Sequence, residues 1–485
     1  MRAGGDGGLP IKLDSTSNGE FAPVPLPEDA RRANRLAAEQ ASVHARRLGL
    51  SRRAFLVSSC GAASTLLAMN QSFGQSGRRG GFYALPPQAA LEPELAEAHL
   101  GGAEFIFDVQ SHHVSPQRPW RHRSRFWGRT LAGFPFADCG LPDALDCFSA
   151  EQFVKEIFLD SDTDLAVLSF VPEPDQDAAP LTIEEAAATR ALVAGLEDGH
   201  RLLLHGPVHP GFPGELERMA ELSERWKISA WKTYTQYGPE GRGYWLDDEE
   251  RGLPFVERAR ALGVKVICVH KGFPLPGMRP EHSDCRDVGR VARLFPDVQF
   301  IIYHSGFETG TRERAYDPTA QRRGIDSLVR SLQENQVEPG SNVYAELGST
   351  WRFLMRDPDQ AAHALGKLLR SVGEDHVLWG TDSIWYGSPQ DQIQAFRSFQ
   401  ISEELRERHG YPEITPGIRA KVFGLNATRP YGIAPEEVRR RLAGDPIDTA
   451  RSLYAEAPDP SFATYGPRTR REFLSLLRLS GGSRI

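Results

Sequence analysis

Short apolar runs alternate with longer amphipathic stretches through most of the chain from Phe105 onward. The apolar runs are typical of buried strands, whereas stretches in which apolar residues recur every three or four positions are typical of helices. Helical patterns lie between the runs, for example at residues 214–226, 253–263, 286–295 and 359–373. Eight runs are expected to be strands, at residues 105–114, 164–171, 201–210, 228–237, 264–272, 298–306, 343–349 and 377–383.

These repeated units predict an α/β fold in which eight parallel strands close into a (β/α)8 barrel. Parallel strands are buried on both faces, which explains why the runs are apolar along most of their length. An open, doubly wound sheet is the alternative, but it would normally carry a glycine-rich phosphate-binding loop after the first strand. The residues that follow Val114 contain no such loop.

Polar residues gather at the carboxyl ends of the predicted strands. In a parallel barrel these ends meet at one face, where barrel enzymes keep their chemistry. Three strands that end in histidine and one that ends in aspartate therefore predict one shared site. The residues concerned are His112, His113, Lys232, His270, His304 and Asp382.

The order of these motifs resembles that of the amidohydrolase-related family of metal-dependent barrel hydrolases, which includes aminocarboxymuconate-semialdehyde decarboxylase. The resemblance runs from about Phe105 to Ile433 and includes a closing segment, ITPGIRAKVFGLNATRPYGI. It implies a metal bound by two first-strand residues, by His270 in VICVHKG and by Asp382 in LWGTDS. It also implies that His304 in FIIYHSG is a catalytic residue or a ligand of a second metal.

The first strand departs from the usual His-x-His pattern. Because strand side chains alternate, Gln110 and His112 share one face and His113 lies on the other. Gln110 can offer only an amide oxygen, a weaker donor than imidazole. His112, His270 and Asp382 would still suffice for a catalytic zinc site, with manganese or another divalent ion as the alternative. A degraded site that binds metal poorly is the competing interpretation.

Three residues are candidates for substrate binding. Lys232 would pair with a substrate carboxylate, or would bridge two metals if it were carbamylated. Tyr234 lies near the end of the same strand, and Glu308 and Glu346 lie near the ends of other predicted strands. Arg121 belongs to the loop PQRPWRHRSRFWG, whose arginines suit bidentate recognition of a carboxylate. A solvated surface loop is an equally good interpretation of that segment.

The leading functional hypothesis is a metal-dependent hydrolase of a small carboxylated lactone, ester or amide. Asp382 would hold the metal and accept a proton from water, and His304 would stabilise the oxyanion or shuttle the proton. A non-oxidative decarboxylase of an unsaturated or aromatic carboxylate is the second hypothesis. A binding protein whose catalysis has lapsed is the third, and Gln110 is its only support.

The sequence around Arg52-Arg53 resembles a twin-arginine export signal. Ser51-Arg-Arg-Ala-Phe-Leu56 precedes an uncharged run at residues 57–69, which is too short to span a membrane. We therefore expect the twin-arginine export machinery as a partner and a periplasmic or extracellular location. Cys139 and Cys147 could pair in such an oxidising compartment.

The predicted organisation has four parts. Residues 1–50 form a long leader with a helix from Glu28 to Leu48, and residues 51–80 form the signal region. Residues 81–433 form the barrel, and residues 434–485 form a C-terminal extension with helical patterns at EEVRRRLAG and RTRREFLSLLRL. This extension is expected to pack against the barrel or against another subunit of a homo-oligomer.

Composition narrows the class of partner. The 485 residues are 40% hydrophobic and 25% charged, which is ordinary for a soluble globular protein. The formal net charge of -7 argues against general binding to nucleic acid or anionic membranes, which requires a basic surface. A small-molecule substrate is therefore the expected partner.

Overall fold

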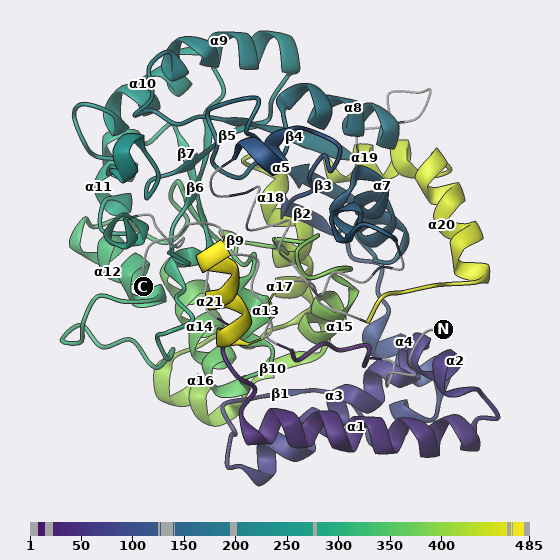
Figure 1. Ribbon diagram of the computed structural model, residues 1–485. Helices are drawn as coiled ribbons and strands as arrows, with labels where there is room; N and C mark the ends of the chain where they lie inside the picture. The colour runs from purple at the N-terminus through teal and green to yellow at the C-terminus, as the bar shows by residue number, and fades with distance from the viewer. Residues whose placement is uncertain are drawn as a thin grey trace.

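Eight parallel strands form a closed barrel in the computed structural model of the chain (Figure 1). The structure describes residues 8–14, 23–124, 127, 139, 141–194, 201–274, 279–462, 467 and 469–479. The last strand returns to the first through hydrogen bonds from Val109 N to Trp379 O (3.0 Å) and from Asp382 N to Gln110 O (2.8 Å). The predicted (β/α)8 barrel is confirmed. Its strands are β2 (Phe107–Ser111), β3 (Leu165–Leu168), β4 (Leu202–Pro207), β5 (Ala230–Tyr234), β6 (Val266–His270), β7 (Gln299–Tyr303), β8 (Val343–Glu346) and β9 (Val377–Leu378).

All eight predicted strands form, but each is shorter than its apolar run. The strand β2 ends one residue before His112, and β7 ends one residue before His304. After β7 and β9 the backbone leaves the ladder at His304 and Asp382, because both residues adopt positive φ angles that are foreign to a strand. His304 and Asp382 therefore lie in the loops of the site, whereas His270 still ends β6.

Alternate strand residues fill the inside of the barrel with one apolar cluster, and the remaining residues pack beneath the surrounding helices. Phe107, Cys268 and Tyr303 belong to the inner cluster. Tyr431, from the closing segment, packs its ring 5.2 Å from that of Phe107. The closing segment therefore seals the barrel at the end opposite the predicted site.

Amphipathic helices cover the outside of the barrel. The helix α14 is representative, because Pro358 occupies its first turn and the Asp357 side chain accepts a hydrogen bond from Gln360 N. It buries Leu365 and Leu368 against the barrel. The helices of this layer are α8 (Ile183–Ala194), α9 (Glu215–Trp226), α10 (Gly252–Ala261), α11 (Val288–Leu294), α12 (Ile325–Glu334), α14 (Pro358–Ser371) and α15 (Gln390–Ser398).

Short helices occupy the loops between these elements. The α-helical ones are α4 (Pro93–Leu100), α5 (Trp120–Arg123), α7 (Ala150–Phe153), α13 (Thr350–Leu354), α16 (Glu403–His409), α17 (Pro416–Ala420) and α18 (Asn426–Thr428). Single 3₁₀ or π turns are η1 (Pro87–Ala90), η2 (Ala144–Phe148), η3 (Val154–Leu159), η4 (Pro239–Gly241), η5 (Pro280–Ser283), η6 (His304–Gly306) and η7 (Lys421–Leu425).

Three N-terminal helices pack against one another and the rest of the protein, at the bottom of Figure 1. They are α1 (Glu28–Arg47), α2 (Arg52–Val57) and α3 (Ser59–Gln75). The buried face of α1 is a stripe of alanines at helical spacing, which permits close packing on α3. The strand β1 (Gly81–Tyr83) then pairs antiparallel with β10 (Phe399–Ile401). The division of the chain at residues 50, 80 and 433 stays a prediction.

No helix within the described ranges is long and apolar enough to cross a membrane.

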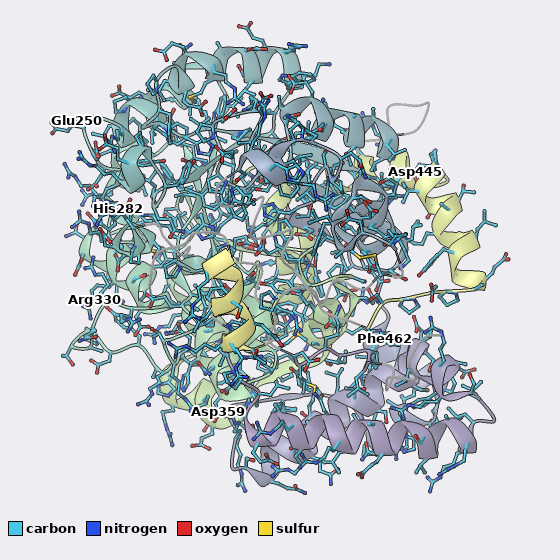
Figure 2. The ribbon with its side chains drawn as sticks, in the orientation of Figure 1. Glu250, His282, Arg330, Asp359, Asp445 and Phe462 are labelled. Atoms are coloured by element: carbon cyan, nitrogen blue, oxygen red, sulfur yellow. A yellow bond between two sulfur atoms is a disulfide. The ribbon has the colours of Figure 1, made fainter. Side chains whose placement is uncertain are left out.

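The C-terminal extension consists of α19 (Pro435–Leu442), α20 (Pro446–Glu456) and α21 (Arg470–Leu479). The first and last correspond to the two helical patterns in the sequence, whereas α20 was not predicted. The sequence feature that marks the start of α20 is Asp445-Pro446. The Asp445 side chain accepts a hydrogen bond from Asp448 N at 2.7 Å, and proline suits the first turn of a helix. Asp445, labelled in Figure 2, also pairs with the buried Arg201 at 2.8 Å and so fastens the extension to the barrel.

Candidate active site

The histidines and the aspartate of the predicted site lie together at the carboxyl ends of the strands. His270 ends β6, while His112, His304 and Asp382 lie in the loops after β2, β7 and β9. Their exposed fractions are only 0–2%. Ionisable side chains are rarely buried to this degree unless they are paired or bind a metal, so these residues form one candidate site.

The backbone around the site is strained. Among the described residues, eight that are not glycine have a positive φ angle, and five of these lie in the loops after β6 to β9. Such conformations cost free energy and concentrate at functional sites. The five residues are Phe273 (30°), His304 (64°), Ser305 (54°), Ser349 (54°) and Asp382 (59°).

Asp382 accepts three hydrogen bonds from side chains. Its Oδ1 atom lies 3.0 Å from Gln110 Nε2 and 3.2 Å from His112 Nε2, and its Oδ2 atom lies 2.5 Å from Ser349 Oγ. Burial alone would raise the pKa of Asp382, but the hydrogen bond and charge of His112 and the bond from Ser349 hold it below its usual value. Asp382 is therefore a carboxylate at neutral pH.

His270 and His304 form the second pair of donors. His304 Nε2 lies 3.2 Å from His270 Nδ1, while His304 Nδ1 lies 2.6 Å from Gly348 O and His270 Nε2 lies 3.1 Å from Phe273 O. A carbonyl oxygen can only accept, so the proton of each neutral ring lies on the nitrogen that faces a carbonyl. Burial lowers the pKa of His304 to about 4 and that of His270 well below its usual value. At neutral pH the lone pair of His304 Nε2 therefore faces the lone pair of His270 Nδ1.

This donor set fits a divalent cation. Metal–nitrogen bonds of about 2.0–2.1 Å place neighbouring ligand atoms of a tetrahedral zinc site roughly 3.3 Å apart. The His112–Asp382 and His270–His304 pairs both have a spacing of 3.2 Å, and a cation would satisfy the facing lone pairs. In the described part of the chain, no three His, Cys, Asp or Glu side chains form a complete metal-binding group. The structure thus shows two separate pairs of donors.

Gln110 presents its amide nitrogen, not its oxygen, to Asp382. Its Oε1 atom lies beside Gly348, where a Cβ would approach it to 2.3 Å, and it accepts no hydrogen bond from the described residues. A carboxylate needs a donor, which is the chemical reason for this orientation of the amide. Ligation by Gln110, predicted from the strand pattern, would require the amide to turn over.

Glu346, at the end of β8, fixes the backbone of the site. One of its oxygens accepts a hydrogen bond from His304 N at 2.9 Å and the other accepts one from Gly348 N. A Cβ on Gly380 would lie 1.7 Å from the carboxyl group, so this position must be glycine. Burial raises the pKa of Glu346 to about 8.

The pKa of Glu346 predicts a pH-dependent difference in stability from the variant Glu346→Gln. The pKa of glutamate in an unfolded chain is about 4.3, so Glu346 contributes stability below that pH and loses it as the pH rises toward 8. The amide cannot titrate. The difference in unfolding temperature should therefore shift in favour of the variant between about pH 5 and about pH 8.

The measurement is thermal unfolding of both proteins in the presence of a chelator. The amide also loses one acceptor, but that cost is the same at every pH. Glu404→Gln is the control, because Glu404 is an exposed helix residue paired with Arg408. A difference between Glu346→Gln and the wild type that does not change with pH would contradict the assignment.

Of the three candidate substrate-binding residues, two lie beside the site. Lys232 is buried, with Nζ 3.7 Å from the ring centroid of Tyr303 and 4.7 Å from that of Tyr234. Tyr234 stacks on His270 with a centroid distance of 4.6 Å, and its hydroxyl donates to Phe170 O. Lys232 and Tyr234 thus lie beside the site.

Arg121 has other partners. Its guanidinium lies 2.7 Å from Asp143 Oδ2 and 3.5 Å from Pro116 O, and neither of these contacts belongs to the site. Arg125 and Phe126 of the same loop lie outside the described residues. Glu308 pairs with Arg323 at 2.7 Å rather than with a site residue.

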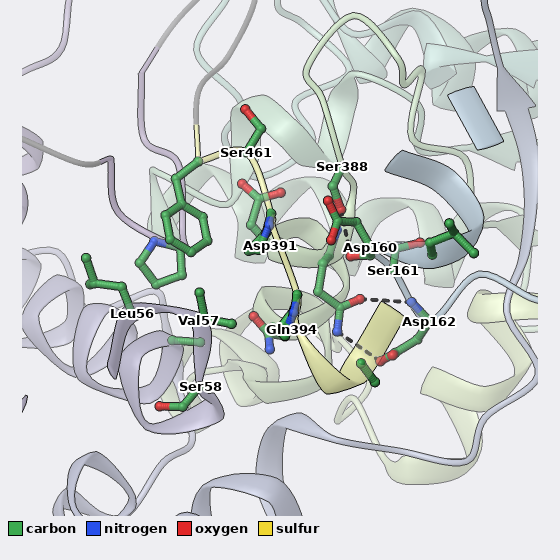
Figure 3. A pocket seen from close by; sticks show the side chains of 18 of the residues that line it. Leu56, Val57, Ser58, Asp160, Ser161, Asp162, Ser388, Asp391, Gln394 and Ser461 are labelled. Atoms are coloured by element: carbon green, nitrogen blue, oxygen red, sulfur yellow. Dashed lines mark hydrogen bonds between the residues drawn. The ribbon is translucent and has the colours of Figure 1, made fainter. Parts of the chain in front are cut away.

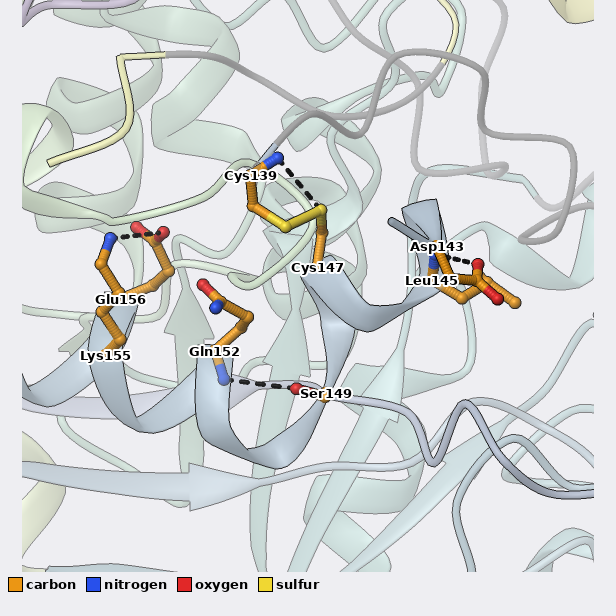
Figure 4. Close-up of a disulfide and its surroundings, with 8 residues drawn as sticks. All are labelled: Cys139, Asp143, Leu145, Cys147, Ser149, Gln152, Lys155 and Glu156. Atoms are coloured by element: carbon orange, nitrogen blue, oxygen red, sulfur yellow. Dashed lines mark hydrogen bonds and ion pairs between the residues drawn. A yellow bond between two sulfur atoms is a disulfide. The ribbon is translucent and has the colours of Figure 1, made fainter. Parts of the chain in front are cut away.

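His113 points away from the site, as the strand alternation predicts. Its Nε2 atom lies 2.9 Å from Thr189 Oγ1 of α8. On the site side, the Trp385 ring stacks on His112 with a centroid distance of 5.5 Å, and Phe148 packs on Trp385 at 5.6 Å. Cys139 and Cys147, which the sequence left as a possible pair, form a disulfide directly before Phe148 (Figure 4).

Two residues of the site were missed at the level of sequence. Ser349 donates to Asp382, and Asp108 accepts hydrogen bonds from Thr381 N and Gln110 N, both at 3.0 Å. Burial raises the pKa of Asp108 to about 7. The sequence signal was the position of each residue, since Asp108 lies within β2 and Ser349 lies in the loop that follows β8.

The amidohydrolase family matches residues 154–433, more than half of the chain, so this protein belongs to that family. The match begins after β2, so Gln110 and His112 lie outside it. No curated protein matches the chain.

Solved structures show a distant likeness. An uncharacterized TIM-barrel protein from Bordetella bronchiseptica is 14% identical with a TM-score of 0.44, over 70% of this chain and 100% of that one. A manganese-bound 5-carboxyvanillate decarboxylase from Novosphingobium aromaticivorans is 14% identical (TM-score 0.43; 68% and 98% covered). A putative 2-pyrone-4,6-dicarboxylic acid hydrolase from Pseudomonas putida is 16% identical (TM-score 0.41; 68% and 98% covered). Family membership rests on the match over residues 154–433.

Proposed function

We propose that this protein is a metal-dependent hydrolase of a small carboxylated lactone, ester or amide. The observation that supports it is the grouping of His112, His270, His304 and Asp382, buried together at the carboxyl end of the barrel. His112, His270 and Asp382 would hold the ion, with zinc as the first candidate and manganese as the second. When bound, such an ion lowers the pKa of water and polarises a carbonyl group.

The chain supplies the remaining chemistry. Asp382 is ionised and accepts the proton of the attacking water, while Ser349 and Gln110 hold its carboxylate in place. His304 is neutral near pH 7, so its Nε2 atom is a proton acceptor rather than a donor. Lys232 offers a positive charge to the substrate carboxylate, and Tyr234 and Trp385 provide flat apolar walls.

A metal-dependent non-oxidative decarboxylase is the second candidate. The observation in its favour is the burial of the site, because decarboxylation consumes no net water and gains from desolvation of the carboxylate. Lys232 and the aromatic walls would then receive an unsaturated or aromatic carboxylate.

One experiment tests both candidates. The purified protein is assayed for bound metal and then offered a panel of lactones, esters and aromatic carboxylates, with detection of new carboxylic acid and of carbon dioxide. New acid without carbon dioxide supports the hydrolase, and carbon dioxide supports the decarboxylase. A protein that takes up no divalent ion under any loading condition would refute both.

We also propose that Arg52 and Arg53 direct export by the twin-arginine pathway to the periplasm or beyond. The sequence motif supports it, and so does the disulfide, which is typical of oxidising compartments. A reporter fused after Gly81 should be exported, and Arg52→Lys with Arg53→Lys should abolish that export. The fractionated reporter is measured, with Arg46→Lys and Arg47→Lys in the same leader as the control. Export that survives the first double substitution would exclude the signal.

A further inference from the structure

The N-terminal segment at residues 9–14 is built into the protein next to the candidate site. Ile11 and Leu13 are 0% and 1% exposed and belong to the main apolar cluster. Lys12, between them, is 5% exposed, although lysine is almost never buried without partners. The partners of Lys12 therefore indicate what this segment does.

The Lys12 ammonium group holds the loop that follows Asp382. Its Nζ atom donates to Tyr386 O at 3.0 Å and to Ser388 O at 2.8 Å, and it lies 3.6 Å from Asp391 Oδ1. The Lys12 backbone N–H also donates to Asp391 Oδ2, at 3.1 Å. Figure 3 shows Ser388 and Asp391 on the wall of a cavity of about 370 Å³ that Lys12 also lines.

Two arginines fasten the backbone of the same segment. Arg352 donates to Lys12 O and, at 2.9 Å, to Asp14 O, and Arg356 donates to Leu13 O at 3.2 Å. Three consecutive carbonyl groups are thus bound by charged side chains from α13 and the residues just after it. Such a specific set of contacts indicates a permanent position rather than loose packing of a leader.

A chain of hydrogen bonds leads from the held loop to Asp382. The Tyr386 hydroxyl lies 2.8 Å from Ser349 Oγ, which in turn donates to Asp382 Oδ2 at 2.5 Å. Because the Ser349 proton is already committed to the carboxylate, the Tyr386 hydroxyl must donate to Ser349. Holding the Tyr386 carbonyl therefore fixes the residue that orients Ser349 on Asp382.

We propose that residues 9–14 hold the loop that follows Asp382 and that Lys12 is a positioning residue, acting through Tyr386 and Ser349 on Asp382. This inference rests on the proposed function, in which Asp382 holds the metal. The proposal requires that the active protein retains residues 9–14, whichever segment directs export.

The test uses the full-length protein and the substitution Lys12→Met, which retains the buried stem but cannot donate a hydrogen bond. Hydrogen exchange at residues 383–389 is measured without metal, and Co²⁺ is then titrated while its visible absorption is recorded. Hydrogen exchange should become faster, and the Co²⁺ absorption bands should shift. The Co²⁺ dissociation constant should rise about tenfold, which is the lower end of the usual effect of removing a residue that supports a metal ligand. Lys265→Met is the control, since Lys265 pairs only with Asp297 among the described residues and lies at the surface.

Lys12→Arg keeps the charge beside Asp391 but directs its donors differently, so the same changes are expected at a smaller size. If Lys12→Met does not fold, the hydrogen exchange and Co²⁺ binding of Lys12→Arg test the proposal instead. A lower unfolding temperature with wild-type exchange and a wild-type Co²⁺ spectrum would mark a purely structural role and overturn the proposal. If the wild-type protein binds no Co²⁺, the proposed function fails, while the exchange measurement still decides whether Lys12 holds the loop.

Discussion

Asp382→Asn is expected to lower turnover by about 10²–10⁴-fold, the usual loss when a positioned acid or base is removed, and to leave the barrel folded. The side chain accepts hydrogen bonds from Gln110, His112 and Ser349 at once. An amide has one accepting oxygen, so at least one of these donors would face an NH₂ group. It also lacks the negative charge that holds a cation and takes a proton.

Turnover, bound metal and the circular dichroism spectrum are compared with those of the wild type. Asp297→Asn is the control, because Asp297 forms ion pairs with Arg260 and Lys265 at the surface. Loss of turnover in Asp382→Asn alone, with unchanged circular dichroism, supports the assignment. Wild-type turnover in that variant would remove Asp382 from the mechanism.

His304→Asn is expected to lower turnover by a similar factor of about 10²–10⁴ while metal content stays nearly unchanged. The reason is that His112, His270 and Asp382 are the proposed ligands, whereas His304 accepts a proton. Burial lowers the pKa of His304 to about 4, so the active, neutral form is lost as the pH falls through that value. The variant should lack this acid limb in the dependence of turnover on pH.

Metal content and the pH profile are measured together, with His363→Asn as the control. The pKa of His363 is also lowered to about 4 by burial, but this residue contacts Tyr411 on the outside of the barrel. Its variant should keep both the metal and the acid limb. If His304→Asn loses its metal along with its turnover, His304 is a ligand, and the facing nitrogens of His270 and His304 bind the ion together.

Local patterns in the sequence determined the barrel and most of the site. Eight apolar runs with polar ends predicted eight strands and the face at which His112, His270, His304 and Asp382 meet, because these features depend on residues close in the chain. The same alternation placed His113 on the opposite face from His112. The closeness of Cys139 and Cys147 within one loop showed only that they could pair.

Only the tertiary structure decided which groups touch. Gln110 donates to Asp382 across 272 residues, and Lys12 reaches Tyr386 across 374 residues, although neither pair has a periodic signature. Arg121 resembled a residue that binds carboxylates, and the carboxylate that it contacts is Asp143 of its own loop. The uncharged run at residues 57–69 lies largely in the buried helix α3, and its role in export stays a prediction, because small apolar residues suit both an export signal and a tightly packed helix. Burial and hydrogen-bond partners depend on the whole folded chain, so no local pattern could assign them.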